Sequence, residues 1–143
     1  MLKKSIECWI YNQKINKFLL LEVDDTKIQF WQPITGGIEM GESAKYAAIR
    51  EVYEETGLII SSNNIFKIGV QRIRIDDNLV IDKTLFLTIV DKEKIIISNE
   101  HINWRWEEKK EVIEALHWEN NIQSFNKTLQ ILNKYFHLSP PPF

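Results

Sequence analysis

Three glutamates near the middle of the chain, Glu51, Glu54 and Glu55, have a spacing that could support catalysis. Residues three and four positions apart lie on one face of an α-helix, so the three carboxylates would face the same way. They fall in the last turn before Gly57, where the helix dipole already presents negative charge. This arrangement is unfavourable unless a cation offsets it. The alternative is an acidic helix face exposed to solvent, the usual explanation of three glutamates taken alone.

The expected cation is Mg²⁺ or Mn²⁺. Carboxylates are hard oxygen ligands that suit these ions, and no Cys or His lies near the three glutamates in the sequence. The adjacent glycines Gly36 and Gly37 signal unusual backbone geometry or a close approach. Ala44, Ala47 and Ala48 continue the glutamate face toward the start of the helix. Their small side chains would let the helix approach the glycine-rich loop closely.

The same segment matches a known pattern at every defining position. The pattern is Gly36, five residues, Glu42, seven residues, Arg50-Glu51, the aliphatic Val52, any residue, Glu54-Glu55, any residue, Gly57 and the aliphatic Leu58. It resembles the Nudix box, the signature of a superfamily of metal-dependent hydrolases. The resemblance implies an α/β fold, an α/β/α sandwich with a mixed β-sheet and a loop-helix catalytic element. It also implies hydrolysis of a phosphoanhydride bond without a covalent enzyme intermediate.

The resemblance also implies roles for individual residues. Glu51, Glu54 and Glu55 resemble the family's metal-binding glutamates, one of which would help to activate the attacking water. Arg50 resembles the arginine that pairs with these glutamates and orients them. Glu42 resembles the first glutamate of the box, largely a positioning residue.

Two further ligands follow from the resemblance. In relatives the loop supplies a backbone carbonyl to the metal, here that of Thr35 or Gly36. In many relatives a distant glutamate adds a ligand or a base, and Glu100, just before His101, is the candidate. The alternative for Glu100 is an ordinary loop glutamate.

The residues that flank the box resemble one branch of the superfamily, the dihydroneopterin triphosphate and dATP pyrophosphohydrolases. That branch has a Trp-Gln-x-x-Thr-Gly lead-in, here Trp31 to Gly36, and a Glu-His segment followed by a tryptophan. Trp31, Gln32 and Arg72 are therefore the candidate substrate-binding residues. Trp31 could stack on a ring or belong to the core, and Arg72 could bind a phosphate or lie on a solvated face. The branch typically has arginines after the second strand, where this chain has residues 21–24 as Leu-Glu-Val-Asp.

Three functions are compatible with these residues. The leading hypothesis is a pyrophosphohydrolase that converts a nucleoside triphosphate-like substrate to a monophosphate and pyrophosphate. The second is hydrolysis of another linked diphosphate, such as a dinucleoside polyphosphate, a nucleotide sugar or an oxidised nucleotide. The third is a nucleotide sensor that does not hydrolyse its ligand. Sensors often lose glutamates of the box, whereas this chain keeps all of them.

The surrounding elements must position these residues. Residues 43–56 are expected to form the catalytic helix, with Ser43 as N-cap and Gly57 in the left-handed position after the last turn. Strands are expected at residues 5–11, 18–23, 65–75, 79–90 and 95–98, and further helices at residues 107–116 and 119–136. The last helix has an apolar stripe that is expected to pack: Ile122, Phe125, Leu129, Leu132 and Phe136.

Composition limits the remaining possibilities. With 143 residues, 44% of them hydrophobic, the chain is expected to form one domain over residues 1–143. A formal net charge of −2 argues against a general nucleic-acid binder. The resemblance to the Nudix superfamily implies that the partner is a small nucleotide-like diphosphate. Cys8 is the single cysteine and is expected to be a buried packing residue. No window of the sequence approaches 18 consecutive apolar residues, so we expect no membrane partner. We expect a cytoplasmic protein that is a monomer or a homodimer.

Overall fold

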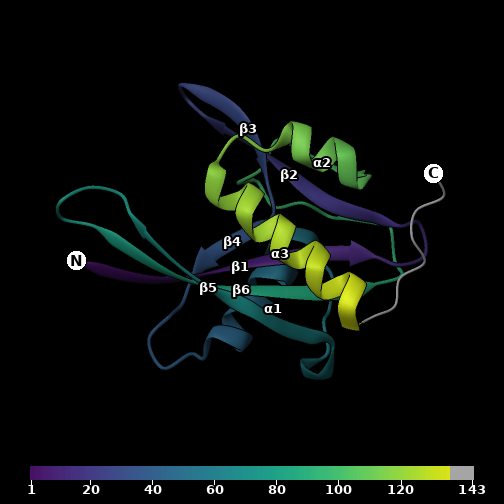
Figure 1. The fold of residues 1–143 in the computed structure, drawn as a ribbon, viewed down its shortest axis with the longest axis horizontal. Helices are drawn as coiled ribbons and strands as arrows, with labels where there is room; N and C mark the ends of the chain where they lie inside the picture. Colours follow the sequence, from purple (N-terminus) through teal and green to yellow (C-terminus); the bar gives the residue numbers. More distant parts are fainter. Residues whose placement is uncertain (136–143) are drawn as a thin grey trace.

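A computed structural model describes residues 1–135, which form one mixed β-sheet with helices on both faces (Figure 1). The strands are β1 (Leu2–Asn12), β2 (Lys17–Asp25), β3 (Ile28–Gln32), β4 (Ile34–Gly37), β5 (Ile65–Arg74), β6 (Val80–Val90) and β7 (Asn103–Glu107). The helices are α1 (Ala44–Thr56), α2 (Lys109–Ala115) and α3 (Glu119–Tyr135), with a short 3-10 turn at Ser62–Asn64.

The sheet is built around β1. The strand order is β3-β2-β1-β6-β5, while β4 pairs with β1 and β7 pairs with β2. The pairing of β1 with β6 is parallel and the other strand pairings are antiparallel. Because successive side chains of a strand point to opposite faces, β1 contributes Ile6, Cys8 and Ile10 to one layer and Trp9 and Tyr11 to the other.

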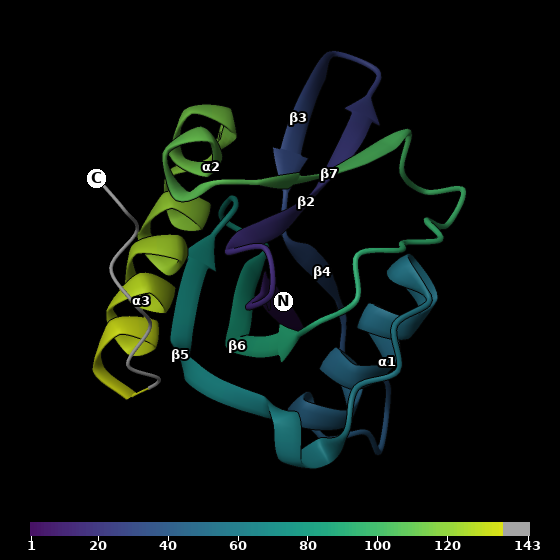
Figure 2. The same cartoon turned by 90° about the vertical axis from the view of Figure 1, so that its right-hand side faces the viewer.

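The two layers are separate hydrophobic cores. One lies under α1 and includes Ala47, Ala48 and Val52, and the other lies under α3 and includes Phe125 and Leu132. Figure 2 shows α1 and α3 on opposite sides of the sheet. This arrangement confirms the expected α/β/α sandwich. It places the glutamate face of α1 against the strand and loop that carry the glycine pair.

The expected packing residues lie where the sequence indicated. Cys8 is fully buried, and burial raises the pKa of its thiol. In α3 the apolar stripe contacts the second core through Ile122, Phe125, Leu129 and Leu132. Phe136, the last member of the predicted stripe, lies outside the described residues.

The predicted strand at residues 95–98 is wrong. This segment is irregular because its backbone bonds to the end of α1: Ile96 N donates to Thr56 O at 2.9 Å. Ile95 nevertheless enters the core, and Ile96 is exposed. The sequence did not predict strand β7. Because β7 ends at Glu107, the helix predicted at residues 107–116 begins only at Lys109. Strands β3 and β4 were also not expected; they flank Pro33.

No helix within residues 1–135 is long and apolar enough to cross a membrane.

Candidate active site

Helix α1 begins and ends at the residues predicted from the sequence. The Ser43 side chain accepts a hydrogen bond from Tyr46 N at 3.2 Å, which caps the first turn. Gly57 has a φ of 77° and donates from its backbone N–H to Tyr53 O, which ends the helix. The three glutamates therefore lie in the last turn and a half. Their side chains run from solvent into the protein: Glu54 is 53% exposed, Glu51 13% and Glu55 4%.

Gly36 is the point where β4 approaches the helix. A Cβ atom at Gly36 would overlap the carboxylate group of Glu51, so a larger residue there would displace the Glu51 side chain from its present position. At Gly37 nothing lies within 4 Å of where a Cβ would stand. Neither residue has a positive φ. The expectation of a close approach is thus confirmed at Gly36 and not at Gly37.

Arg50 connects the glycine-rich loop to the glutamates. Its Nε and Nη2 donate to the two carboxylate oxygens of Glu42 at 2.7 and 2.9 Å, and Nη2 also donates to Gly37 O at 2.9 Å. Its Nη1 donates to Glu51 at 2.8 Å and to Glu54 at 3.2 Å. The hydrogen bonds from Arg50, and then from the backbone N–H of Glu39, lower the pKa of Glu42 to about 2. One guanidinium therefore fixes the loop and orients two of the catalytic candidates.

Glu55 is the most buried carboxyl of the group. Desolvation, and then the charges of Glu51, Glu100 and Glu54, raise its pKa to about 9. Its Oε2 atom is buried without a hydrogen-bond partner. Burial likewise raises the pKa of Glu51, against the opposing effect of Arg50. Glu55 is thus a buried acid whose ionised form lacks compensation from the protein.

Glu100 belongs to the same electrostatic group. Its charge raises the pKa values of both Glu51 and Glu55, so the loop after β6 brings it to the face of α1. The neighbouring His101 is buried, and its Nε2 lies 3.4 Å from Glu55 Oε1. Burial lowers the pKa of His101, against the opposing effect of the Glu100 charge.

The donor set fits a hard divalent cation. Four carboxyl groups and the backbone carbonyl of the Gly36 loop offer oxygen ligands, and Glu55 Oε2 is a buried oxygen without a hydrogen-bond partner. Glu51 and Glu54 contact Arg50, so a cation would have to share their oxygens with the guanidinium. As they stand, no three His, Cys, Asp or Glu side chains in residues 1–135 form a group that could hold a metal ion.

The candidate substrate residues Trp31 and Gln32 lie on β3. The Arg105 guanidinium lies over the Trp31 ring at 4.1 Å from its centroid, and the ring packs against the core under α3. Gln32 Nε2 donates to Thr35 Oγ1 at 3.4 Å, directly before Gly36. Gln32 is therefore tied to the glycine-rich loop, and one face of Trp31 is covered.

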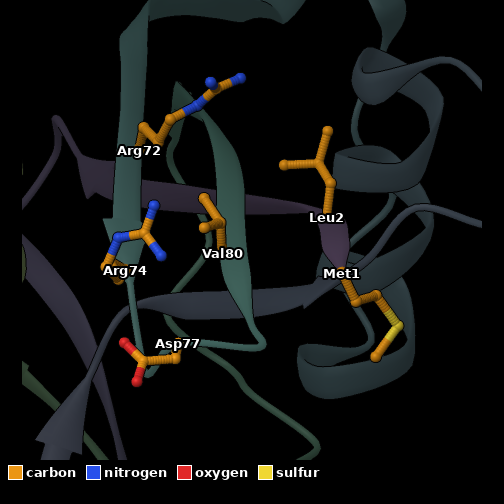
Figure 3. A pocket seen from close by; sticks show the side chains of 6 residues that line it. All are labelled: Met1, Leu2, Arg72, Arg74, Asp77 and Val80. Atoms are coloured by element: carbon orange, nitrogen blue, oxygen red, sulfur yellow. The ribbon is translucent and has the colours of Figure 1, made fainter.

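Arg72 lies on β5, near the β5–β6 hairpin (Figure 3). It is 67% exposed, and its Nη2 is 3.8 Å from Asp82. It lines a pocket of about 500 Å³ with Met1, Leu2, Arg74, Asp77 and Val80, none of which is a catalytic candidate. The structure thus brings together Arg50, Glu51, Glu54, Glu55, Glu100 and Gly36, and leaves Arg72 outside this group.

Comparison with known proteins decides the family. Residues 1–127 match the family model described as the NUDIX domain. The chain belongs to the Nudix family. A dihydroneopterin triphosphate diphosphatase from Haemophilus influenzae is 33% identical over 138 residues, which cover 88% of this chain and 87% of that protein. The Nudix chain described here is therefore a pyrophosphohydrolase, a hydrolase that acts on acid anhydrides, and Nudix hydrolases generally use divalent metal ions.

Solved Nudix structures confirm the fold. The dihydroneopterin triphosphate pyrophosphohydrolase of E. coli has a TM-score of 0.73 and 24% identity, covering 89% of this chain and 96% of its own. An Ap4A hydrolase of C. elegans in a binary complex has a TM-score of 0.72 and 21% identity, covering 92% and 99%. Two proteins named for different substrates match about equally well, so the fold does not distinguish between substrates.

Sequence reasoning had not singled out the contact of His101 with Glu55. The sequence places His101 directly after Glu100, but it indicates a role only for the glutamate of this pair. The partner of His101 is 46 positions away in the chain, so the contact depends on the tertiary fold.

Proposed function

We propose that this Nudix protein hydrolyses a triphosphate-like substrate, of the dihydroneopterin triphosphate or dATP type, to a monophosphate and pyrophosphate. Mg²⁺ or Mn²⁺ would be held by Glu51, Glu54, Glu55 and the carbonyl of Gly36. The observation that carries the proposal is Glu55, whose carboxyl group is buried near three other acidic groups and has one oxygen without a hydrogen-bond partner. The 33% identical diphosphatase supports the choice of substrate.

The chemistry would be substitution at phosphorus by water. The water oxygen forms a bond to the α-phosphorus, the anhydride bond to the β-phosphate breaks, and pyrophosphate leaves with the electron pair. A bound divalent cation would supply charge neutralisation on the phosphate oxygens and lower the pKa of water. The chain's own residues supply the proton acceptor and the orientation of the carboxylates.

The proton released by water needs a carboxylate base. Glu54 is the most exposed of the three helix glutamates, and Glu100 approaches from the facing loop. Either would contribute about 10² to 10⁴ in rate as a general base. Arg50 would hold Glu51 and Glu54 in place through its Nη1. The hydrogen bonds from Arg50 to Glu42 would keep the backbone of the loop between β4 and α1 at a fixed distance from the helix.

For substrate binding, Gln32 is the better supported of the candidates because it bonds to Thr35 beside the glycine-rich loop. Arg105 covers one face of the Trp31 ring, and the ring also packs against the core under α3. Stacking of the ring on a substrate would therefore compete with this packing. Arg72 would act on a substrate only through a part that reaches the β5–β6 hairpin.

A substrate panel with Mg²⁺ tests this function. Dihydroneopterin triphosphate, dATP, a dinucleoside polyphosphate, a nucleotide sugar and an oxidised nucleotide would be incubated with the protein. Inorganic phosphate would be measured with and without added pyrophosphatase, and the nucleotide products would be separated by ion-exchange chromatography, which detects cleavage that releases no pyrophosphate. We expect phosphate from the two triphosphates only when pyrophosphatase is present. Turnover restricted to the other linked diphosphates would favour the second function. Nucleotide binding without any turnover would favour a sensor.

A further inference from the structure

The segment between β6 and β7 carries Glu100 and wraps around the C-terminal end of α1. Its first half is fixed by hydrogen bonds: Asn12 Nδ2 donates to Lys92 O at 3.1 Å and Trp106 Nε1 donates to Glu93 O at 2.9 Å. Ile96 N then donates to Thr56 O, at the end of the helix. These bonds lie before Glu100, so they leave open what holds Glu100 itself.

The second half of the segment is held by Ser98 and His101, and the backbone N–H of Glu100 donates to Ser98 Oγ at 3.4 Å. The backbone N–H of His101 donates to Ser98 O at 3.3 Å, which closes a turn around Glu100. The next residue, Ile102, donates to Glu22 O at 3.1 Å and leads into β7. The His101 side chain is 3% exposed and points to α1, where its Nε2 lies 3.4 Å from Glu55 Oε1.

The two oxygens of the Glu55 carboxyl group have different surroundings. Oε1 faces His101, whereas Oε2 is buried without a partner. A distance of 3.4 Å is at the long end for an N–H···O contact, which would tighten once the carboxylate bears its charge. A group that holds one oxygen of a ligand carboxylate orients the other, and such outer partners typically affect metal affinity 10- to 100-fold.

We propose that His101 is a positioning residue of the active site, which holds Oε1 of Glu55 and at the same time anchors the turn that presents Glu100 to α1. Its other nitrogen, Nδ1, is buried without a hydrogen-bond partner, so the imidazole acts through Nε2. The inference rests on the proposed function, because it takes Glu55 as a cation ligand. It adds that the helix site and the loop glutamate are assembled by one side chain.

The test compares His101→Leu with His101→Gln, because glutamine keeps an N–H donor and leucine does not. The matched control is Thr128→Val, which removes a buried hydrogen bond, Thr128 Oγ1 to Ser124 O, in α3 on the opposite face of the sheet. Mn²⁺ binding is measured by calorimetry without substrate, at a temperature where each variant is folded by circular dichroism. The Mg²⁺ activation constant, kcat and KM are measured on the same preparations.

We expect His101→Leu to weaken Mn²⁺ binding about 10- to 100-fold and to raise the Mg²⁺ activation constant similarly, with KM changed less than about threefold. His101→Gln should recover part of both effects, and Thr128→Val should leave both unchanged. In a double-mutant cycle, Glu100→Gln should cost clearly less in kcat when His101 is already leucine. A His101→Leu protein with wild-type Mn²⁺ binding and fully additive effects with Glu100→Gln would overturn the inference.

The outcome is separable from failure of the proposed function. If Glu55→Gln binds Mn²⁺ as tightly as the wild type, Glu55 is not a ligand and the proposed site itself is wrong. If Glu55→Gln loses binding while His101→Leu and His101→Gln keep it, the site stands and His101 is only a packing residue. If His101→Leu does not fold, His101→Phe replaces it, because phenylalanine fills the site with a ring but has no N–H donor. Wild-type Mn²⁺ affinity and activation constant in His101→Phe would then indicate packing alone.

Discussion

Arg50 binds Glu42 through two parallel hydrogen bonds, from Nε at 2.7 Å and from Nη2 at 2.9 Å, and so joins the loop before α1 to the middle of that helix. Glu42 Oε1 also accepts from the backbone N–H of Glu39 at 3.0 Å. The loop between β4 and α1 is therefore held by side chains of the Nudix box itself. Because the same guanidinium reaches Glu51 and Glu54, the position of the loop and the orientation of the carboxylates are coupled.

The first prediction is that Arg50→Lys lowers kcat/KM by about 10- to 100-fold although the charge is kept. A lysine cannot make two parallel bonds to Glu42 and still reach Glu51 and the Gly37 carbonyl. Steady-state kinetics at saturating Mg²⁺ measure the effect. Arg74→Lys, on the exposed hairpin end of β5, is the control and should retain full activity. Equal activity of the two variants would mean that only the charge at position 50 matters.

The second prediction concerns Glu54. Because its side chain is 53% exposed, Glu54→Gln should leave the melting temperature almost unchanged. Loss of its charge should nevertheless lower kcat by at least about 10²-fold, as expected for a cation ligand or general base. Glu114→Gln, an exposed glutamate of α2, is the matched control. Wild-type turnover of Glu54→Gln, or full activity of the wild type in EDTA, would contradict the assignment of the site.

The third prediction is that Mg²⁺ or Mn²⁺ raises the melting temperature by binding the folded state, and that Glu55→Gln blunts the rise. The cation would supply what the unpartnered Oε2 of Glu55 lacks. Thermal denaturation over a series of cation concentrations measures the shift, with Ca²⁺-free EDTA samples as the baseline. The same rise in mutant and wild type would place the cation elsewhere in the protein.

The catalytic helix could be predicted closely from the sequence because its signals are local. Ser43 caps the first turn, Gly57 takes the left-handed position, and the glutamate spacing defines one face. The close approach of Gly36 was also foreseen, although Gly37 turned out to have open space around it. Local chemistry of this kind needs no knowledge of the rest of the chain.

Features that depend on distant pairings were not predictable. Residues 95–98 have the composition of a strand, yet their backbone bonds to the end of α1 instead of to a neighbouring strand. The contact of His101 with Glu55 and the covering of Trp31 by Arg105 each join segments that meet only in the folded sheet. A buried cluster shows the same limit: Glu7 accepts from Asn121 Nδ2 at 2.8 Å and from Lys83 Nζ at 3.2 Å. Nothing in the sequence around Glu7 indicates these partners.

The fourth prediction is a pH dependence of stability in the absence of metal. The pKa of Glu55 rises from its ordinary 4.5 to about 9 on folding, so the folded state binds this proton more tightly than the unfolded chain. Stability from this group is therefore full below about pH 4.5 and is lost as pH rises toward 9. We expect the melting temperature in EDTA to fall across this range, and Glu55→Gln to flatten the fall. Saturating Mn²⁺ should also reduce it, because the cation binds the ionised carboxylate. A fall of the same size in Glu55→Gln would assign it to other groups.

The last prediction separates the two roles of Trp31, and the structure favours packing. Arg105 covers one face of the ring at 4.1 Å, and the ring contacts the core under α3. Trp31 also pairs with Leu116 through an isolated parallel bridge, which links β3 to the segment after α2.

Because the ring is only partly buried, Trp31→Ala should cost about 2 to 4 kcal/mol in the free energy of unfolding, somewhat below the value for a fully buried tryptophan. Urea denaturation measures this cost. If the ring only packs, Trp31→Ala should change KM for dihydroneopterin triphosphate no more than KM for a diphosphate that lacks such a ring system. Trp118→Ala, which removes a tryptophan that is 42% exposed, should cost less stability. If the ring instead stacks on substrate, KM for the ring-bearing triphosphate alone should rise about 10-fold with kcat nearly unchanged, since one stacked base contributes about 1 to 3 kcal/mol.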